Sequence, residues 1–193
     1  MADIASLLDA LDPTTREAES LTLSGREQAQ LWDLAADGPV ITLDHFVPAS
    51  IAPNVAVRHP GRNTIPVARH FQLFAKVFAR DETDARLCNG YNDSNAWFIT
   101  PGYFVAYETA GNAEWMRRGG VVVDYLRVPD GKVPAGWPKV VPNTVGLQRF
   151  VYFRTRDFMR RVSAHMSIGR AAEQRAKGDR ELDFWFTLCR RDP

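Results

Sequence analysis

The chain has 193 residues, of which 45% are hydrophobic and 24% charged, and its formal net charge is +1. These values are ordinary for a globular protein, and the length suits one domain with a core of its own. No segment approaches the ~18 consecutive apolar residues of a membrane-spanning helix, and the first residues lack the basic region and apolar run of a signal peptide. We therefore expect a single cytoplasmic domain over residues 1–193, monomeric or homodimeric, without a membrane partner.

Cysteine and histidine are sparse. Cys88 and Cys189 lie far apart without C-x-x-C spacing, and we expect both to be reduced, partly buried thiols. A metal site built from His45, His59 and His70 would have no support from local spacing. The sequence therefore predicts no metal site, and it identifies no cofactor.

The charges are unevenly distributed along the chain. Residues 1–37 carry eight Asp and Glu against two Arg, whereas residues 149–193 carry eleven Arg and Lys against six acidic residues. Such a basic end can bind an anionic partner, or the acidic leader can pack beside it within one molecule. We favour the second interpretation, because no basic run exceeds two residues. The pattern argues against nucleic acid as a partner.

The first 37 residues are predicted to be helical. Asp12-Pro13 is typical of an N-cap followed by proline in the first turn, and Ser24 to Glu27 has capping-box spacing. The first helix has an apolar face at i, i+3, i+4 and i+7, formed by Ile4, Leu7, Leu8 and Leu11. The helix that begins at the capping box is expected to bury three residues: Leu31, Trp32 and Ala35.

From residue 39 the apolar period changes to two, which predicts strands. The segment 66–80 fits a helix and a strand, and we favour the strand because the segments after it are β. A bulge is expected at Pro101-Gly102, and 170–180 is either a short helix or a long hairpin loop. The other predicted strands are 40–43, 54–59, 96–107, 121–128, 147–153, 162–168 and 182–189.

These strands are not separated by the long helices that a parallel sheet requires. Closure of an antiparallel sheet into a barrel buries about eight strands and leaves no exposed edge. We therefore predict a mainly β (α+β) protein. Residues 38–193 form a lipocalin-like antiparallel β barrel behind the helical leader at 1–37.

Four segments resemble the GXWXG-type family of uncharacterised bacterial β proteins. The matching pieces are Phe74-Ala75-Lys76-Val77-Phe78, Asp124-Tyr125, residues 157–169 and residues 184–191. They cover about half of the chain, and no G-x-W-x-G sequence occurs in it. The resemblance implies a barrel and carries no established reaction.

No nucleotide-binding glycine pattern, nucleophile elbow, H-E-x-x-H motif or zinc-type spacing is present. Two residues are candidate catalytic groups. His165, on the predicted strand 162–168, is a general base or a haem ligand if it faces the interior and a solvated side chain if it faces outward. Asp124 shares a strand face with Val122 and Leu126, and inward burial would raise its pKa unless a cation or several donors pair with it.

Six residues are candidate ligand contacts. Lys76 lies between Phe74 and Phe78, so an inward orientation would bury its ammonium group among apolar neighbours, as it would the carboxylate of Asp124. An inward Arg161 would hold a ligand carboxylate through two hydrogen bonds. Four aromatic residues fit core packing and also the lining of a cavity: Trp97, Tyr103, Tyr107 and Tyr125.

Two functions follow as hypotheses. The first is binding of a small, largely apolar ligand, with or without a carboxylate, inside the barrel. The alternative is an acid–base enzyme of cyclase, isomerase or hydrolase type that uses the same cavity, with Asp124 and His165 in contact. The sequence leaves open which of the two applies.

Overall fold

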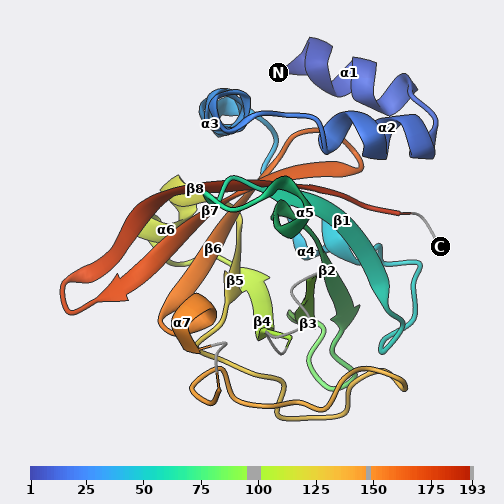
Figure 1. Cartoon of the computed structure of the whole chain (residues 1–193). Helices are drawn as coiled ribbons and strands as arrows, with labels where there is room; N and C mark the ends of the chain where they lie inside the picture. The colour runs from blue at the N-terminus through green and yellow to red at the C-terminus, as the bar shows by residue number, and fades with distance from the viewer. Residues whose placement is uncertain (95–100, 147–148, 192–193) are drawn as a thin grey trace.

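The computed structural model describes residues 1–94, 101–146 and 149–191, apart from the side chains of residues 150 and 151. Eight antiparallel strands close into a barrel in which each strand pairs with the next and β8 returns to β1 (Figure 1). The strands are β1 (Val57–Asn63), β2 (Leu73–Arg80), β3 (Leu87–Ser94), β4 (Tyr103–Glu108), β5 (Val121–Asp124), β6 (Thr155–Arg161), β7 (Met166–Arg175) and β8 (Gly178–Cys189). The predicted barrel is confirmed.

The helical N-terminal segment is also confirmed. The Asp12 carboxylate accepts hydrogen bonds from two amides of the second helix, and Ser24 with Glu27 forms a complete capping box. The helices are α1 (Ala2–Ala10), α2 (Pro13–Ser20), α3 (Gly25–Leu34), the 3₁₀ turn η1 (Ala35–Asp37), α4 (Leu43–Phe46), α5 (Arg69–Gln72), α6 (Ala113–Arg118) and α7 (Arg149–Tyr152).

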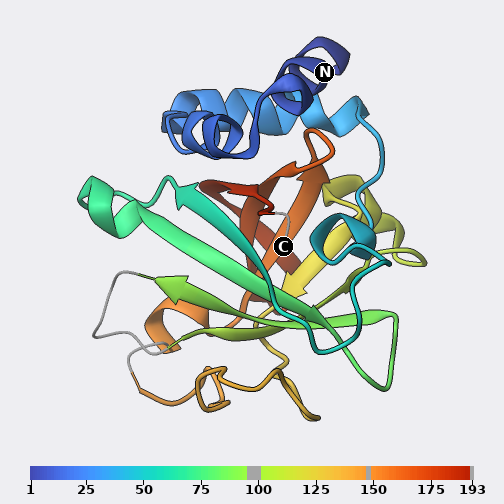
Figure 2. The same cartoon turned by 90° about the vertical axis from the view of Figure 1, so that its right-hand side faces the viewer.

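The first three helices lie together against the outer surface of β7 and β8 (Figures 1 and 2). Leu31 and Trp32 of α3 are buried there in one apolar cluster with Phe158 and Ile168. The acidic leader meets the basic C-terminal end directly, because the Arg191 guanidinium donates to both carboxylate oxygens of Glu17 at 2.6 and 2.7 Å. Part of the charge asymmetry is thus neutralised within the molecule.

Two short helices close opposite ends of the barrel. Phe46 of α4 is fully buried and stacks on Phe78, near the end of β2, with 4.7 Å between ring centroids. Tyr152 of α7 stacks on Tyr125, which reaches the other half of β2. The segment 127–146 passes beneath this second end (Figure 1).

Aromatic rings fill the interior by lying directly over glycines of neighbouring strands. A Cβ added to Gly90 would lie 2.3 Å from the Phe104 ring, and one added to Gly169 would lie 2.2 Å from the Phe186 ring. Only glycine permits such a close approach. The inside of the barrel is therefore a packed core, comparable to that of other small barrels.

Several strand predictions were wrong. Residues 40–42 are irregular and Leu43 begins α4, the described part of 147–153 forms α7, and residues 162–165 are the turn between β6 and β7. Two strands, β3 and β6, were not predicted. Segment 66–80 contains α5 followed by β2, and 170–180 is a hairpin of β7 and β8. Residues 96–100 of the predicted strand 96–107 lie outside the described residues.

Gly169→Ala tests the packing of the interior. We expect a loss of about 1–3 kcal/mol in the free energy of unfolding, because the new methyl group overlaps the Phe186 ring. The matched control is Gly131→Ala, where no atom lies within 4 Å of the added Cβ, and its change is within about 0.5 kcal/mol. Urea titrations of the variants measure both, and equal stabilities would contradict the packed interior.

Candidate functional site

A lysine ammonium lies inside the barrel. Lys76 of β2 is 2% exposed, and its Nζ donates to the Asp157 carboxylate at 2.9 Å, to the Asn92 amide oxygen at 2.9 Å and to the Tyr125 hydroxyl. Strands β2 and β6 are four positions apart in a ring of eight. The ion pair of Lys76 and Asp157 therefore spans the interior from one wall to the other.

Four aromatic rings surround this ammonium group. The Nζ lies 4.7 Å from the Phe186 ring centroid, and the centroids of Tyr125, Phe104 and Phe74 follow at 5.0, 5.4 and 5.5 Å. Rings at these distances stabilise a cation through their negative faces. Burial nevertheless lowers the pKa of Lys76, and the Asp157 charge offsets only part of that effect.

The other members of the cluster are hydrogen-bonded to one another. The Tyr125 hydroxyl accepts from the Asn92 amide at 2.7 Å and donates to Asp157 at 3.2 Å. Burial raises the pKa of Tyr125 well above 10 and that of Tyr152, stacked beside it, to about 12. Both phenols are therefore neutral near pH 7. The cluster can pass protons among its members while it excludes water.

Two cavities lie outside the barrel. The smaller, about 150 Å³, lies between η1, the segment after it and α6, with Arg160 and Arg161 at its wall. The larger, about 570 Å³, is a groove beside the ends of β2, β3 and β4. Neither is lined by Lys76.

We call the larger cavity the Tyr107 groove. Leu43, Leu87 and Tyr107 form its apolar walls, and three guanidinium groups border it, those of Arg80, Arg86 and Arg127. The Arg127 guanidinium lies over the Tyr107 ring, 5.3 Å from its centroid. The carboxylates of Asp84 and Glu108 also line it, so the groove combines an aromatic surface with three guanidinium groups and two carboxylates.

Asp124 fixes the Tyr107 ring from outside the barrel. The Tyr107 hydroxyl donates to the Asp124 carboxylate at 2.8 Å, and Arg156 lies 3.2 Å from the same carboxylate. Arg156 also binds Asp179 at 2.8 Å. Burial and the Asp124 charge raise the pKa of Tyr107 to about 12, so the phenol stays a hydrogen-bond donor. Asp124 is buried but paired, and it faces away from the interior.

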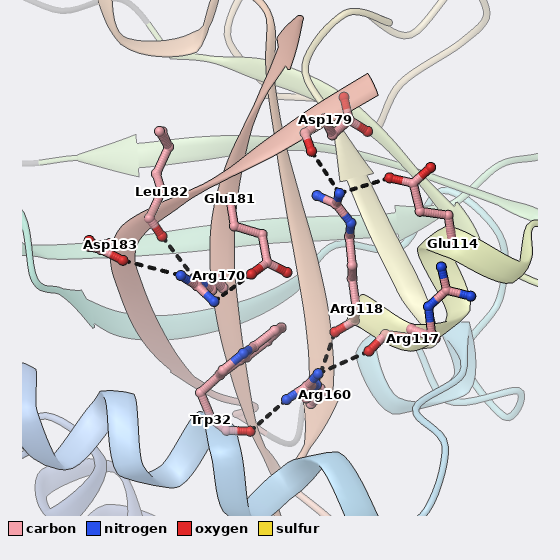
Figure 3. Close-up of polar contacts among 10 residues, drawn as sticks. All are labelled: Trp32, Glu114, Arg117, Arg118, Arg160, Arg170, Asp179, Glu181, Leu182 and Asp183. Atoms are coloured by element: carbon pink, nitrogen blue, oxygen red, sulfur yellow. Dashed lines mark hydrogen bonds and ion pairs between the residues drawn. The ribbon is translucent and has the colours of Figure 1, made fainter. Parts of the chain in front are cut away.

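The arginines of β6 and β7 are held by the protein itself (Figure 3). Arg160 donates to the backbone carbonyls of Trp32, Arg117 and Arg118, and its guanidinium lies 3.9 Å from the Trp32 ring centroid. Arg170 binds Glu181 and Asp183 in the same outer layer. These side chains fasten the helices and the hairpin to the barrel, so they are not an inward carboxylate site.

The predicted catalytic pair is not brought together. Asp124 lies opposite Arg156 near the start of β6, whereas His165 lies in the turn that follows the end of β6 at Arg161. At about 3.3 Å per residue, β6 separates these two levels by roughly 16 Å. His165 contacts Arg190 through Nδ1 at 3.2 Å.

The predicted ligand contacts are distributed over different surfaces. Lys76 and Tyr125 meet inside the barrel and Tyr107 lines the groove, whereas Tyr103 faces outward and donates to the carbonyl of Pro138 in the segment 127–146. Arg161 binds the Ser163 carbonyl at 3.1 Å beside the smaller cavity. Trp97 lies outside the described residues.

Sequence reasoning missed four residues. Asp157 and Asn92 complete the Lys76 cluster, Tyr152 covers it, and Arg127 borders the groove. The one usable signal was local: Asp157 directly precedes two apolar residues, Phe158 and Met159, which are buried on β6. Asn92 and Arg127 stand in polar segments that give no such signal.

The histidines do not form a metal site. In the described parts of the chain, no group of three or more His, Cys, Asp and Glu side chains is placed to hold a metal ion. His45 and His59 lie near each other around Phe46, whereas His70 is exposed on α5.

No protein-family model, curated protein or solved structure matches this chain. Among the described residues, no helix has the length and apolar character needed to cross a bilayer.

Because His45 is buried, we expect the folded protein to lose stability in acid. Burial first, and then the charges of His59 and Arg190, lower the pKa of His45 well below the ordinary value of 6.5. As pH falls through 6.5 the unfolded chain takes up a proton that the folded protein does not, so stability is complete above that value and declines below it. We expect His45→Gln to reduce the stability difference between about pH 7 and about pH 5.

Urea titrations at both pH values measure this difference. The control is His70→Gln at an exposed position, which keeps the pH dependence of the parent protein. The same pH dependence in His45→Gln as in the parent would show that His45 does not cause the loss.

Proposed function

We propose that this protein binds a small molecule with an apolar or aromatic body and one anionic group, and that the ligand lies in the Tyr107 groove. The observation that supports the proposal most directly is the position of Arg127 over Tyr107 beside a cavity of about 570 Å³. Ligand pockets of this size are common, and they combine apolar walls with a few polar groups.

The groove has three guanidinium groups against two carboxylates, and this excess of positive charge favours an anion. Arg80 is paired with Asp44 at 2.6 Å and Arg86 with Asp84 at 2.9 Å. Among the residues that the structure describes, no carboxylate forms an ion pair with Arg127. A guanidinium group binds a carboxylate through two parallel hydrogen bonds, which makes Arg127 the expected contact for the anionic group.

The walls supply the apolar part of the site. The Tyr107 ring is held in place by the hydrogen bond of its hydroxyl to Asp124, and the Arg127 guanidinium lies over it, so the two planar groups together form a preformed surface for an aromatic or aliphatic group. Leu43 and Leu87 border the same space. The proposal keeps the ligand class that the sequence predicts, and moves the site from the barrel interior to the outer groove.

Two other functions have less support. A ligand inside the barrel would have to displace the rings that surround Lys76, because that side chain is 2% exposed. An acid–base enzyme that uses Asp124 and His165 would require contact between two groups at different ends of β6. Binding in the groove requires neither change.

The anionic aromatic dye anilinonaphthalene sulfonate is a suitable probe. We expect saturable binding, measured as an increase in dye fluorescence. Arg127→Ala should raise the dissociation constant of the dye about tenfold, which corresponds to the free energy of one hydrogen bond to a charged group. Tyr107→Ala removes the aromatic wall and weakens binding further. Added salt weakens binding to the parent protein because it screens the charge.

Arg26→Ala is the matched control, since Arg26 is an exposed arginine on α3. We expect its dye affinity to equal that of the parent. Unchanged affinity in both Arg127→Ala and Tyr107→Ala would place the dye elsewhere and overturn the proposal, as would the absence of saturable binding. A panel of aryl and alkyl carboxylates that displaces the dye then defines the natural ligand class.

A further inference from the structure

The cluster around Lys76 has a feature that ligand binding does not explain. Lys76 and Asn92 are directly opposite each other on neighbouring strands, and their side chains meet inside the barrel with 2.9 Å between Nζ and Oδ1. The Asp157 carboxylate contacts the same Nζ at 2.9 Å. An amine, a carboxamide and a carboxylate are thus enclosed together by aromatic rings.

We propose that Lys76 and Asn92 react with each other to form an intramolecular amide (isopeptide) bond between Nζ and Cγ, with release of ammonia. The bond joins β2 to β3 within the barrel. The proposal does not depend on the Tyr107 groove, which contains none of these residues.

The reaction needs no external reagent. The Lys76 ammonium gives one proton to the Asp157 carboxylate, and the neutral amine attacks the Asn92 carbonyl carbon to form a tetrahedral intermediate. A second proton leaves the attacking nitrogen and passes to Nδ2, the Cγ–Nδ2 bond breaks, and Nδ2 leaves as ammonia, while the first proton stays on Asp157. Lysine amine and asparagine amide give one secondary amide and one ammonia, so atoms and charge balance without oxidant or reductant.

The observed contacts provide the route for the protons. Asp157 lies beside the amine that loses protons, and the Tyr125 hydroxyl lies 3.2 Å from Asp157 and 2.7 Å from the leaving nitrogen, Nδ2 of Asn92. Protons can therefore pass from amine to carboxylate and through the phenol to the leaving group. General acid–base catalysis requires groups within this range of distances.

Burial makes the amine reactive. Desolvation lowers the pKa of Lys76, which increases the neutral fraction that acts as a nucleophile. The strand pairing holds the amine and the amide in contact, so their effective concentration is high. The surrounding rings exclude water, which would otherwise compete for the amide carbon.

Asn92 is the acyl partner because of the charges in the cluster. Asp157 is the carboxylate in contact with the amine, and it is needed to accept the proton. An ionised carboxylate is also a poor target for a nucleophile, whereas the neutral carboxamide of Asn92 is a better one. Asp157 is therefore the proton acceptor, and Asn92 supplies the acyl group.

Intact-mass spectrometry of the purified, unfolded protein tests the proposal. We expect a mass lower than that of the sequence by one ammonia. Trypsin should not cleave after Lys76, and peptide 70–80 should be recovered joined to peptide 87–117. Lys76→Arg and Asp157→Asn should both have the full mass of their sequences, because one lacks the amine and the other the proton acceptor.

A second source of ammonia loss requires a control. Asn89-Gly90 is a sequence in which asparagine can cyclise on its own backbone and release ammonia. Such a ring persists in Lys76→Arg and leaves Lys76 of the parent open to trypsin, so both results separate it from the cross-link. Asn89→Ser should retain the joined peptides.

Three results would overturn the proposal. They are a parent protein with the full mass of its sequence, an ammonia loss in Lys76→Arg equal to that of the parent, and a mass lower by one water with peptide 70–80 joined to the peptide that contains Asp157. The last would assign the acyl group to Asp157. The first and third results are measured on the parent protein alone. The second uses the Lys76→Arg variant, and tryptic cleavage of the parent after Lys76 provides an independent check of it.

Discussion

The ion pair of Lys76 and Asp157 is the constraint around which the barrel interior is organised. Burial of an isolated ammonium or carboxylate costs several kcal/mol, and the cost is offset only when the partner and further hydrogen bonds are well placed. Here Asn92 and Tyr125 supply those bonds. Since the partners come from strands four positions apart, the pair also fixes how the two walls face each other.

The positions of the aromatic rings depend on the ion pair of Lys76 and Asp157. Phe104 and Phe186 can reach the ammonium only because the positions beneath them, Gly90 and Gly169, have no side chain. The interior is consequently filled, and the space for a ligand lies on the outer surface, where Tyr107 and Arg127 border the groove. A packed barrel and an external groove are thus two results of the same arrangement.

The sequence predicted the features that depend on local order. The Asp12 cap and the Ser24 capping box involve residues within three positions, and the alternation around Phe74 and Phe78 correctly placed Lys76 among apolar neighbours. The partner of Lys76 was not predictable in this way, because Asp157 is 81 positions away.

The prediction of a strand at 162–168 was wrong for residues 162–165 and right for residues 166–168, which begin β7, and the error has a physical reason. Val162 and Met166 are both buried, which produces an apolar alternation, but they lie on the two sides of a tight turn and not along one strand. Conversely, β3 was missed because its inward positions include Gly90 and Asn92. The barrel requires these residues for ring packing and for the Lys76 cluster, and both types have low strand propensity.

Strand β5 connects the interior to the groove. Asp124 at its end faces outward and orients Tyr107, while the next residue, Tyr125, turns inward to Lys76. A shift of β5 by one residue would exchange these two faces, so a single register positions both sites. The same holds for β4, where Phe104 covers the ammonium and Tyr107 forms the groove wall. A chemical bond that locks the interior would therefore also stabilise the geometry of the groove, although the two sites share no residue.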